Sequence, residues 1–233
     1  MSKIEILKET PKSPITLIGE RAGICWGADI SDDAKNYKRG LSCLKDNHGR
    51  TLEYVCVDLI IDGYSARVMR EWYTHIGGAP TRLQASTRYI NYSALEDNVI
   101  YPPSIKTNDE AFVVYKDCIL NIQDSYKKLI ELGIKKEDVA NILPLGMCTK
   151  VVDHRNLRNY IDMAENRKCN RAYWEFRKLF NDICTELRNY SDEWAYIVDN
   201  YFLCKCDKLG YCPESRGCGK YKHKGADNEN RED

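Results

Sequence analysis

Histidine, hydroxyl and guanidinium side chains gather in the stretch from Arg70 to Tyr92. It contains one histidine, His75, then a Gly-Gly-Ala-Pro turn at residues 77–80, then two hydroxyls and two arginines: Thr81, Ser86, Arg82 and Arg88. Paired glycines let a backbone approach a ligand closely and adopt positive φ. Guanidinium forks match phosphate oxygens bidentately, so this composition favours an anion site. A surface turn before an edge strand, with solvated arginines, fits the spacing equally well.

The segment HIGGAPTRLQASTRY resembles the signature of flavin-dependent thymidylate synthases. That signature runs Arg-His-Arg, a short spacer, Ser-x-Asn-Glu-x-Ser-x-Arg-Tyr. Four positions agree: His75, Ser86, Arg88 and Tyr89. The departures are Thr74 and Ile76 in place of the flanking arginines, Leu83-Gln84 in place of Asn-Glu, and a spacer two residues longer.

A second segment, residues 140–179, resembles the same family. The matching positions are Leu143-Pro144, Thr149, Asn156-Leu157-Arg158, Arg167 and the run from Ala172 to Arg177. Residues 48–54, HGRTLEY, are similar to the family's His-x-Thr-x-x-Glu-His, with Glu53 at the glutamate and Arg50 at the threonine. Because the segments occur in the family's order, the likeness extends over roughly residues 40–190 and is far more specific than one motif.

The resemblance implies a role for each matching residue. The implied substrate-binding residues are Gln84, Ser86, Arg88, Arg167 and Arg82. The implied flavin-binding residues are Arg50, His75, Asn156, Arg158 and Arg171. Arg167 is also the implied catalytic residue, because it would steady negative charge on the pyrimidine ring. The family's phosphate-binding arginine is Ala140 here, and we expect Arg82 or Arg171 to compensate.

The activity implied by the resemblance is reductive methylation of dUMP to dTMP. The family binds FAD, takes electrons from NADPH, takes its one-carbon unit from methylenetetrahydrofolate, and forms homotetramers with sites built across subunits. Two alternatives stay open. One is a related flavin-dependent methylase or hydroxymethylase of pyrimidine nucleotides, and the other is a non-catalytic nucleotide- or nucleic-acid-binding protein. A helix-borne Arg167 or Arg171 could also simply pair with Glu165 or Glu175.

Composition narrows the function classes. The 35 basic and 35 acidic residues cancel, so net charge gives no reason to expect a nucleic-acid partner. No run of 18 apolar residues predicts a membrane span, and the first residues lack the apolar core of a signal peptide. We therefore expect a cytoplasmic protein, whose 11 cysteines are reduced thiols rather than a disulfide framework.

Four cysteines crowd the C-terminal part of the chain: Cys204, Cys206, Cys212 and Cys218. Four thiolates on a short segment with little core of its own suit a tetrahedral structural zinc ion. Their C-x-C-x5-C-x5-C spacing departs from paired C-x2-C knuckles. Zinc, free thiols, and a disulfide or another metal therefore stay open, and Cys169 could replace Cys204 as a ligand.

The expected fold class is α+β. A small, mainly antiparallel sheet in residues 14–92 should pack on helices in residues 109–202, as in flavin-dependent thymidylate synthases, followed by a cysteine-rich tail. The expected domains are a flavin-dependent thymidylate synthase-like domain at 1–203, the tail at 204–224 and a disordered segment at 225–233.

Periodicity and end signals predict the elements that position the candidate site. Strands are expected at 14–19, 51–62 and 89–92, and Ser65 should cap a short helix that delivers His75. Helices are expected at 109–132, 136–142, 156–190 with a break near Asn166, and 192–202 with Ser191 as cap.

Overall fold

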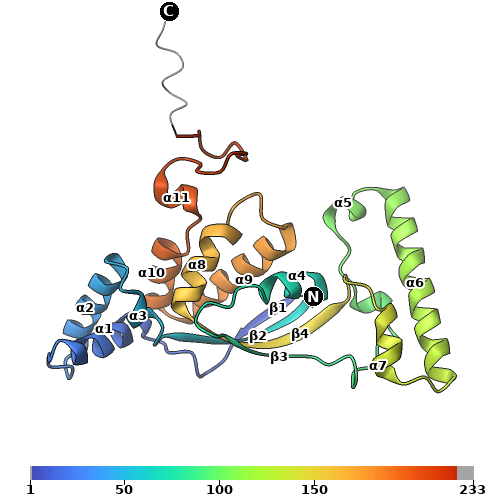
Figure 1. Ribbon diagram of the computed structural model, residues 1–233, viewed down its shortest axis with the longest axis horizontal. Helices are drawn as coiled ribbons and strands as arrows, with labels where there is room; N and C mark the ends of the chain where they lie inside the picture. The colour runs from blue at the N-terminus through green and yellow to red at the C-terminus, as the bar shows by residue number, and fades with distance from the viewer. Residues whose placement is uncertain (1, 225–233) are drawn as a thin grey trace, which may run out of the picture. The chain divides into compact units, whose positions relative to one another are not determined.

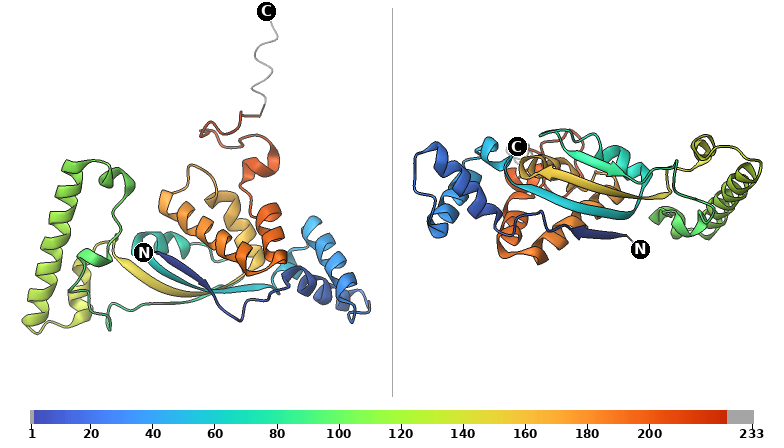
Figure 2. Two further views of the ribbon diagram at one scale, coloured as in Figure 1. Left: turned by 180° about the vertical axis from the view of Figure 1, so that it is seen from behind. Right: turned by 90° about the horizontal axis from the view of Figure 1, so that it is seen from below.

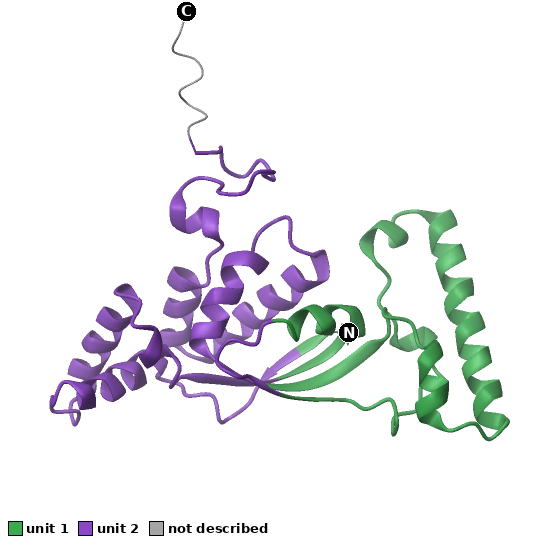
Figure 3. Ribbon diagram, viewed as in Figure 1, with its two compact units in different colours: residues 1–3, 60–74, 82–153 green, residues 4–59, 75–81, 154–233 purple. Residues whose placement is uncertain are grey.

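The computed structural model describes residues 2–224 and divides the chain into two compact units (Figure 3). Unit 1 holds Ile60–Thr74 and Arg82–Asp153 with the first residues of the chain, and unit 2 holds Ile4–Leu59, His75–Thr81 and the chain from His154 onward. The segment 225–233, for which we predict disorder, lies outside the described residues. Within those residues, no helix combines the length and apolarity needed to cross a membrane.

The described residues form one four-stranded sheet (Figure 1). Its strands, in spatial order, are β1 (Lys3–Ile6), β2 (Cys56–Ser65), β4 (Cys148–Asn156) and β3 (Thr81–Gln84). Leu157 N donates to Val55 O beside one end of β2, and Ala66 N donates to Met147 O beside the other, so β2 and β4 run antiparallel. The α+β class is confirmed, but the sheet is not confined to residues 14–92.

Strand β2 confirms the strand predicted for residues 51–62, but it begins later than predicted. Residues 49–52 form the short helix α3 (Gly49–Leu52), so pairing begins at Cys56 rather than Thr51. Val57, Leu59 and Ile61 alternate on a fully buried face, as the two-residue period predicts. Strand β4 has no counterpart among the predicted elements.

Unit 2 is otherwise helical. Its remaining elements are α1 (Pro14–Cys25), α2 (Asp33–Lys45), α8 (Leu157–Arg167), α9 (Trp174–Tyr190), α10 (Asp192–Tyr201) and α11 (Lys205–Leu209). Helices α1 and α2 run side by side (Figure 2), so closely that a Cβ on Gly19 would lie 1.7 Å from the Asn36 carbonyl oxygen. The strand predicted for residues 14–19 is therefore wrong. Ile15 N and Thr16 N donate to the Glu193 carboxylate at 2.6 and 3.0 Å, and this distant cap starts a helix there.

Unit 1 contains α4 (Ala66–Trp72), η1 (Glu96–Asn98), α5 (Pro103–Lys106), α6 (Asp109–Glu131), α7 (Lys136–Val139) and η2 (Ala140–Ile142). Ser65 Oγ accepts a hydrogen bond from Val68 N at 3.1 Å, which confirms the predicted cap. The strand predicted for residues 89–92 is wrong, because Tyr89 N and Ile90 N both donate to Ser86 O and turn the chain.

In unit 2, the long helix predicted from Asn156 breaks at residues 168–173, as expected.

Candidate active site

His75 and Arg167 meet in unit 2 although 92 positions separate them in the sequence. Arg167 ends α8, and its Nε donates to His75 Nε2 at 2.9 Å. Its guanidinium lies 4.5 Å from the ring centre of the buried Phe176, a cation–π distance. The His75 ring meets the same phenyl ring edge-on at 5.7 Å. Two residues predicted from separate motifs thus share one contact, with Phe176 as their common apolar support.

The His75 imidazole is neutral. Burial, reinforced by the positive charges of Arg167 and Arg155, lowers the pKa of His75 from 6.5 to about 4. Since Nε2 accepts the Arg167 hydrogen bond, the ring proton belongs on Nδ1. The contact therefore keeps the full guanidinium charge, which suits stabilisation of an anion. Glu165, one of the two carboxylates weighed as a simple partner for Arg167, instead pairs with Lys208 at 3.0 Å.

Arg155 is a residue of this region that sequence reasoning missed. It comes from β4 and is fully buried. One guanidinium nitrogen donates to the His75 carbonyl oxygen at 2.5 Å and to Asn159 Oδ1. It thereby holds the backbone carbonyl of His75 in place. Arg155 occupies one of the alternating buried positions of β4. Its burial could be predicted from the sequence only if residues 148–156 were first recognised as a strand.

The glycine pair 77–78 has a packing role. A Cβ on Gly78, whose φ is +72°, would lie 2.0 Å from Asn156 Nδ2, and one on Gly77 would lie 2.9 Å from Asn159 Nδ2. Asn156 in turn caps α8, because its Oδ1 accepts from Asn159 N at 2.9 Å. The turn thus lies directly against the start of α8. Asn156 is only 7% exposed, and its flavin contact stays a prediction.

Arg50 and Arg158 flank Glu53 on the surface of unit 2. An Arg158 guanidinium nitrogen lies 2.7 Å from Glu53 Oε1, and one of Arg50 lies 3.8 Å from Oε2. The Arg158 side chain is 51% exposed and that of Arg50 is 89% exposed. Two guanidinium groups against one carboxylate leave a net charge of +1. This donor set fits a phosphate-bearing cofactor such as FAD.

In unit 1, Arg82 and Gln84 are both held by neighbours. The Arg82 guanidinium lies 4.4 Å from the centre of the Tyr73 ring and donates to the Tyr73 carbonyl oxygen at 3.2 Å. Gln84 Nε2 donates to Thr149 Oγ1 at 3.2 Å, so the residue that replaces the family's glutamate is tied to β4. Both residues belong to β3, and their substrate contacts stay predictions.

Arg88 and Ser86 lie in the turn after β3. Ser86 Oγ accepts a hydrogen bond from Arg88 N at 3.3 Å, and Arg88 Nε lies 3.1 Å from Glu137 Oε2. A shallow hollow of about 310 Å³ is lined by Arg88, Tyr89, Lys135, Lys136 and Glu137. Three cations against one carboxylate leave a net positive charge around this hollow, and the predicted anion site stays a prediction.

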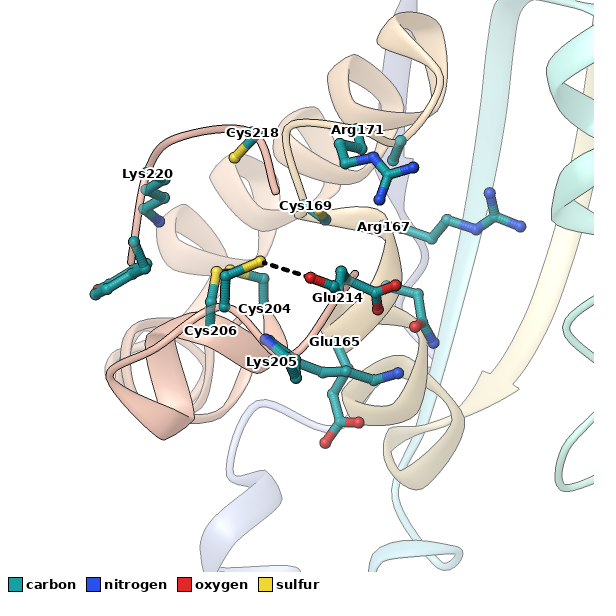
Figure 4. Close-up of a pocket in the computed structure, with 15 residues that line it drawn as sticks. Glu165, Arg167, Cys169, Arg171, Cys204, Lys205, Cys206, Glu214, Cys218 and Lys220 are labelled. Carbon is teal, nitrogen blue, oxygen red and sulfur yellow. Dashed lines mark hydrogen bonds between the residues drawn. The ribbon is translucent and has the colours of Figure 1, made fainter. Parts of the chain in front are cut away.

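Arg171 and the C-terminal cysteines share a pocket of unit 2 (Figure 4). Arg171 follows α8 and donates to the Arg216 carbonyl oxygen. Cys204, Cys206, Cys212, Cys218 and also Cys169 line this pocket, whose volume is about 230 Å³. The thiols of Cys204 and Cys206 lie 3.2 Å apart. Arg171 therefore contacts the cysteine-rich segment, and its predicted flavin or phosphate contact is untested.

Comparison with known proteins gives consistent matches. Residues 5–191 match the family described as "Thymidylate synthase complementing protein". A flavin-dependent thymidylate synthase of Thermococcus onnurineus is 31% identical over 185 residues, covering 74% of this chain and 72% of that protein. One from Nitratidesulfovibrio vulgaris is 26% identical over 241 residues, covering 94% of this chain and 95% of that protein.

Two solved structures share the fold. The flavin-dependent thymidylate synthase ThyX of Helicobacter pylori, complexed with FAD and dUMP, has a TM-score of 0.65 at 18% identity, covering 81% of this chain and 95% of that one. The UMP/dUMP methylase PolB of Streptomyces cacaoi, bound with 5-Br dUMP, has a TM-score of 0.68 at 13% identity, covering 87% and 97%.

Proposed function

This chain belongs to the family of flavin-dependent thymidylate synthases, and we propose that it converts dUMP to dTMP by reductive methylation, with FAD, methylenetetrahydrofolate and NADPH. The observation that carries the proposal is the contact of Arg167 with His75. These residues come from the two motifs that match the family, and chain folding brings them within 2.9 Å of each other.

Arg167 supplies a fixed positive charge to this chemistry. Adding a one-carbon unit at C5 of a uracil ring builds negative charge on the ring and its carbonyl oxygens. A guanidinium that is already oriented stabilises this charge without reorganising, and losing such a donor typically costs about 10²–10³-fold in rate. Arg167 is oriented before substrate arrives, because the His75 ring accepts from its Nε and the Phe176 ring supports its face.

The flavin-side residues bind and orient FAD. Bound FAD supplies the hydride in its reduced form. Arg50 and Arg158 offer guanidinium forks to a phosphate, in competition with Glu53, which now lies between them. His75 stays neutral at physiological pH and thus places no second charge beside Arg167. Asn156 and Arg171 complete the proposed flavin set.

Ser86, Arg88, Arg82 and Gln84 are the proposed dUMP contacts in unit 1. The hollow around Arg88 carries an excess of positive charge, which favours a nucleotide phosphate there. Ala140 and Gln84 replace charged residues of the family, so Arg82 or Arg171 must supply the missing fork. These two departures also favour a second candidate, a flavin-dependent methylase or hydroxymethylase of a related pyrimidine nucleotide.

The assembly we propose is a cytoplasmic homotetramer with sites built across subunits, as the family implies. Nucleic acid is not an expected partner, because the 35 basic and 35 acidic residues of the chain balance.

The decisive experiment measures tritium release from C5-labelled dUMP with folate and NADPH present, combined with identification of the product. We expect flavin absorbance, tritium release and dTMP. Arg167→Gln should lower kcat about 10²–10³-fold. Arg188→Gln is the matched control, because Arg188 pairs with Asp199 on the surface of α9 and α10. A colourless protein that binds dUMP without releasing tritium would reject catalysis.

The product separates the two enzymatic candidates. UMP offered in competition with dUMP tests the nucleotide preference, and a hydroxymethyl product would favour the second candidate. If Arg82 or Arg171 replaces the family's phosphate-binding arginine, then Arg82→Ala or Arg171→Ala should weaken dUMP binding about tenfold or more, because losing a hydrogen bond to a charged group usually costs that much. Unchanged affinity in both variants rejects compensation. Arg70→Ala is the control, since Arg70 is an exposed arginine on α4.

A further inference from the structure

The cysteine tail, residues 204–224, is folded without a core of its own. Helix α11 ends at Leu209, and the residue that caps it, Gly210, has a φ of +75°. Cys212 N then donates to the Lys222 carbonyl oxygen at 2.8 Å and closes a loop. Within the described part of this tail only Cys204 and Cys206 are buried. Apolar burial therefore supplies almost nothing to hold these residues in one conformation.

Thiols line one pocket between the tail and the connection from α8 to α9 (Figure 4). The buried Cys204 and Cys206 have their sulfur atoms 3.2 Å apart. Cys212 and Cys218 line the same pocket, together with Cys169 from the α8–α9 connection. A Cβ on Gly217 would lie 3.1 Å from His223 Nε2 and 3.4 Å from Cys212 Sγ, so the His223 imidazole and the Cys212 thiol both lie beside the turn that carries Cys218.

The charges around this pocket favour an anionic metal centre. Four basic side chains line it, namely Arg167, Arg171, Lys205 and Lys220. Two acidic side chains, Glu165 and Glu214, line it as well, which leaves a net charge of +2. A divalent zinc ion with four thiolates carries a charge of −2, so the lining offsets it.

We propose that Cys204, Cys206, Cys212 and Cys218 bind one zinc ion that fastens the tail to the α8–α9 connection. Four thiolates complete a tetrahedral shell and leave no open position, so the role is structural. Cys212 and Cys218 must move toward the buried pair to reach the usual Zn–S distance of about 2.3 Å. Glycines on both sides of Cys218 permit this movement, and Gly219 already has a φ of +82°.

Asp207 and Cys169 also lie near the four cysteines, and they are left out of the proposed ligand set. Asp207 accepts from the Cys204 thiol at 2.9 Å, and its other oxygen lies 2.5 Å from Lys220 Nζ. We assign it to that ion pair, because a carboxylate held by a lysine is a poorer zinc ligand than a thiolate. Cys169 stays a thiol, because the tail alone supplies four ligands.

The consequence of zinc binding is local order beside Arg171. This arginine donates to the Arg216 carbonyl oxygen, so a fastened tail holds the residue that follows α8. Metal loss should release the tail and expose its basic residues to trypsin. The inference concerns a structural metal and is independent of whether the chain makes dTMP.

The test uses the full chain, prepared anaerobically, with zinc and iron measured by mass spectrometry. We expect about one zinc per chain, as in closed four-thiolate sites. Cys206→Ser and Cys212→Ser should each lose the metal, and trypsin should then cut after Arg216 or Lys220 faster than in the unchanged protein. Cys118→Ser is the matched control, since Cys118 is an exposed cysteine on α6. Asp207→Asn and Cys169→Ser should both keep the zinc.

Several outcomes would overturn the proposal. Less than about a tenth of an equivalent of zinc would exclude the site, because a structural zinc site binds too tightly to be lost in purification. Iron with sulfide in place of zinc would replace it with a cluster. Zinc kept by Cys218→Ser but lost by Cys169→Ser would refute the ligand set. If a chelator removes the metal and tryptic cleavage does not change, the fastening role is wrong.

Discussion

Replacing Gly78 by alanine tests whether the glycine pair exists to accommodate the start of α8. Its φ of +72° is a conformation that residues with a side chain rarely adopt. An added Cβ would also lie 2.0 Å from Asn156 Nδ2, well inside contact distance. The Asn156 side chain would have to leave, and it would take with it the 2.9 Å bond to Asn159 N that caps α8.

Gly27→Ala isolates the backbone part of this cost. Gly27 has a φ of +61°, and a Cβ there would meet nothing within 4 Å. Forcing a left-handed conformation on alanine costs about 1–2 kcal/mol. Gly78→Ala adds the loss of a helix cap, about 0.5–2 kcal/mol, and a displaced buried amide, about 1–3 kcal/mol. We therefore expect Gly78→Ala to reduce the free energy of unfolding by about 1.5–5 kcal/mol more than Gly27→Ala.

Urea unfolding of the FAD-free protein, followed by tryptophan fluorescence, measures both costs without a ligand contribution to stability. The same two substitutions are then made in an Asn156→Ala background, which removes the clashing amide. There the extra cost of Gly78→Ala should disappear. Equal costs for both glycines in the unchanged chain, or an extra cost that persists without the Asn156 side chain, would refute the packing explanation.

Three further predictions concern His75, Trp72 and Ser191. Since the pKa of His75 is about 4 in the folded chain and ordinarily 6.5, only the unfolded chain takes up this proton between those values, so stability falls as pH drops through that window. Urea unfolding should show a free energy that falls from pH 7 to pH 5 by up to about 2 kcal/mol more in the unchanged chain than in His75→Gln. An equal fall in both proteins contradicts the neutral imidazole. Trp72→Phe removes the 3.0 Å donor to the buried Asp153 carboxylate and should cost about 1–3 kcal/mol by the same measurement. Ser191→Ala removes the cap at Trp194 N and should cost about 0.5–2 kcal/mol, with unchanged midpoints counting against the cap.

Helix starts that are capped by a residue close in the sequence were predicted correctly. The helix start that is capped by a residue distant in the sequence was not predicted. The caps at Ser65 and Ser191 were predictable because the hydroxyl and the amide it serves are three residues apart. The start of α1 was mistaken for a strand because its cap is Glu193, whose carboxylate comes from the far end of the sequence. A short apolar run such as residues 14–19 is ambiguous between helix and strand until that partner is known.

Strand β4 was not predicted, because the partners that allow its polar residues to be buried are also distant in the sequence. Its buried positions include Thr149, Asp153 and Arg155 as well as Val151, so burial and apolarity do not coincide. Charged residues become acceptable there because their partners are also buried, as Trp72 is for Asp153. The site residue that sequence reasoning missed, Arg155, lies on this strand. By contrast, Arg167 and His75 were found because each belongs to a motif with recognisable neighbours.

His75 has two arginines beside it although its neighbours in the sequence are uncharged. The arginines that flank the family's histidine are Thr74 and Ile76 here. Thr74 Oγ1 donates to the Glu71 carbonyl oxygen at 2.7 Å, and Ile76 is 69% exposed, so neither brings charge to the site. Positive charge reaches His75 instead from Arg155 at its carbonyl and Arg167 at its ring. Both of these contacts are set by elements distant in sequence, so loss of the flanking arginines leaves the imidazole neutral and next to a guanidinium.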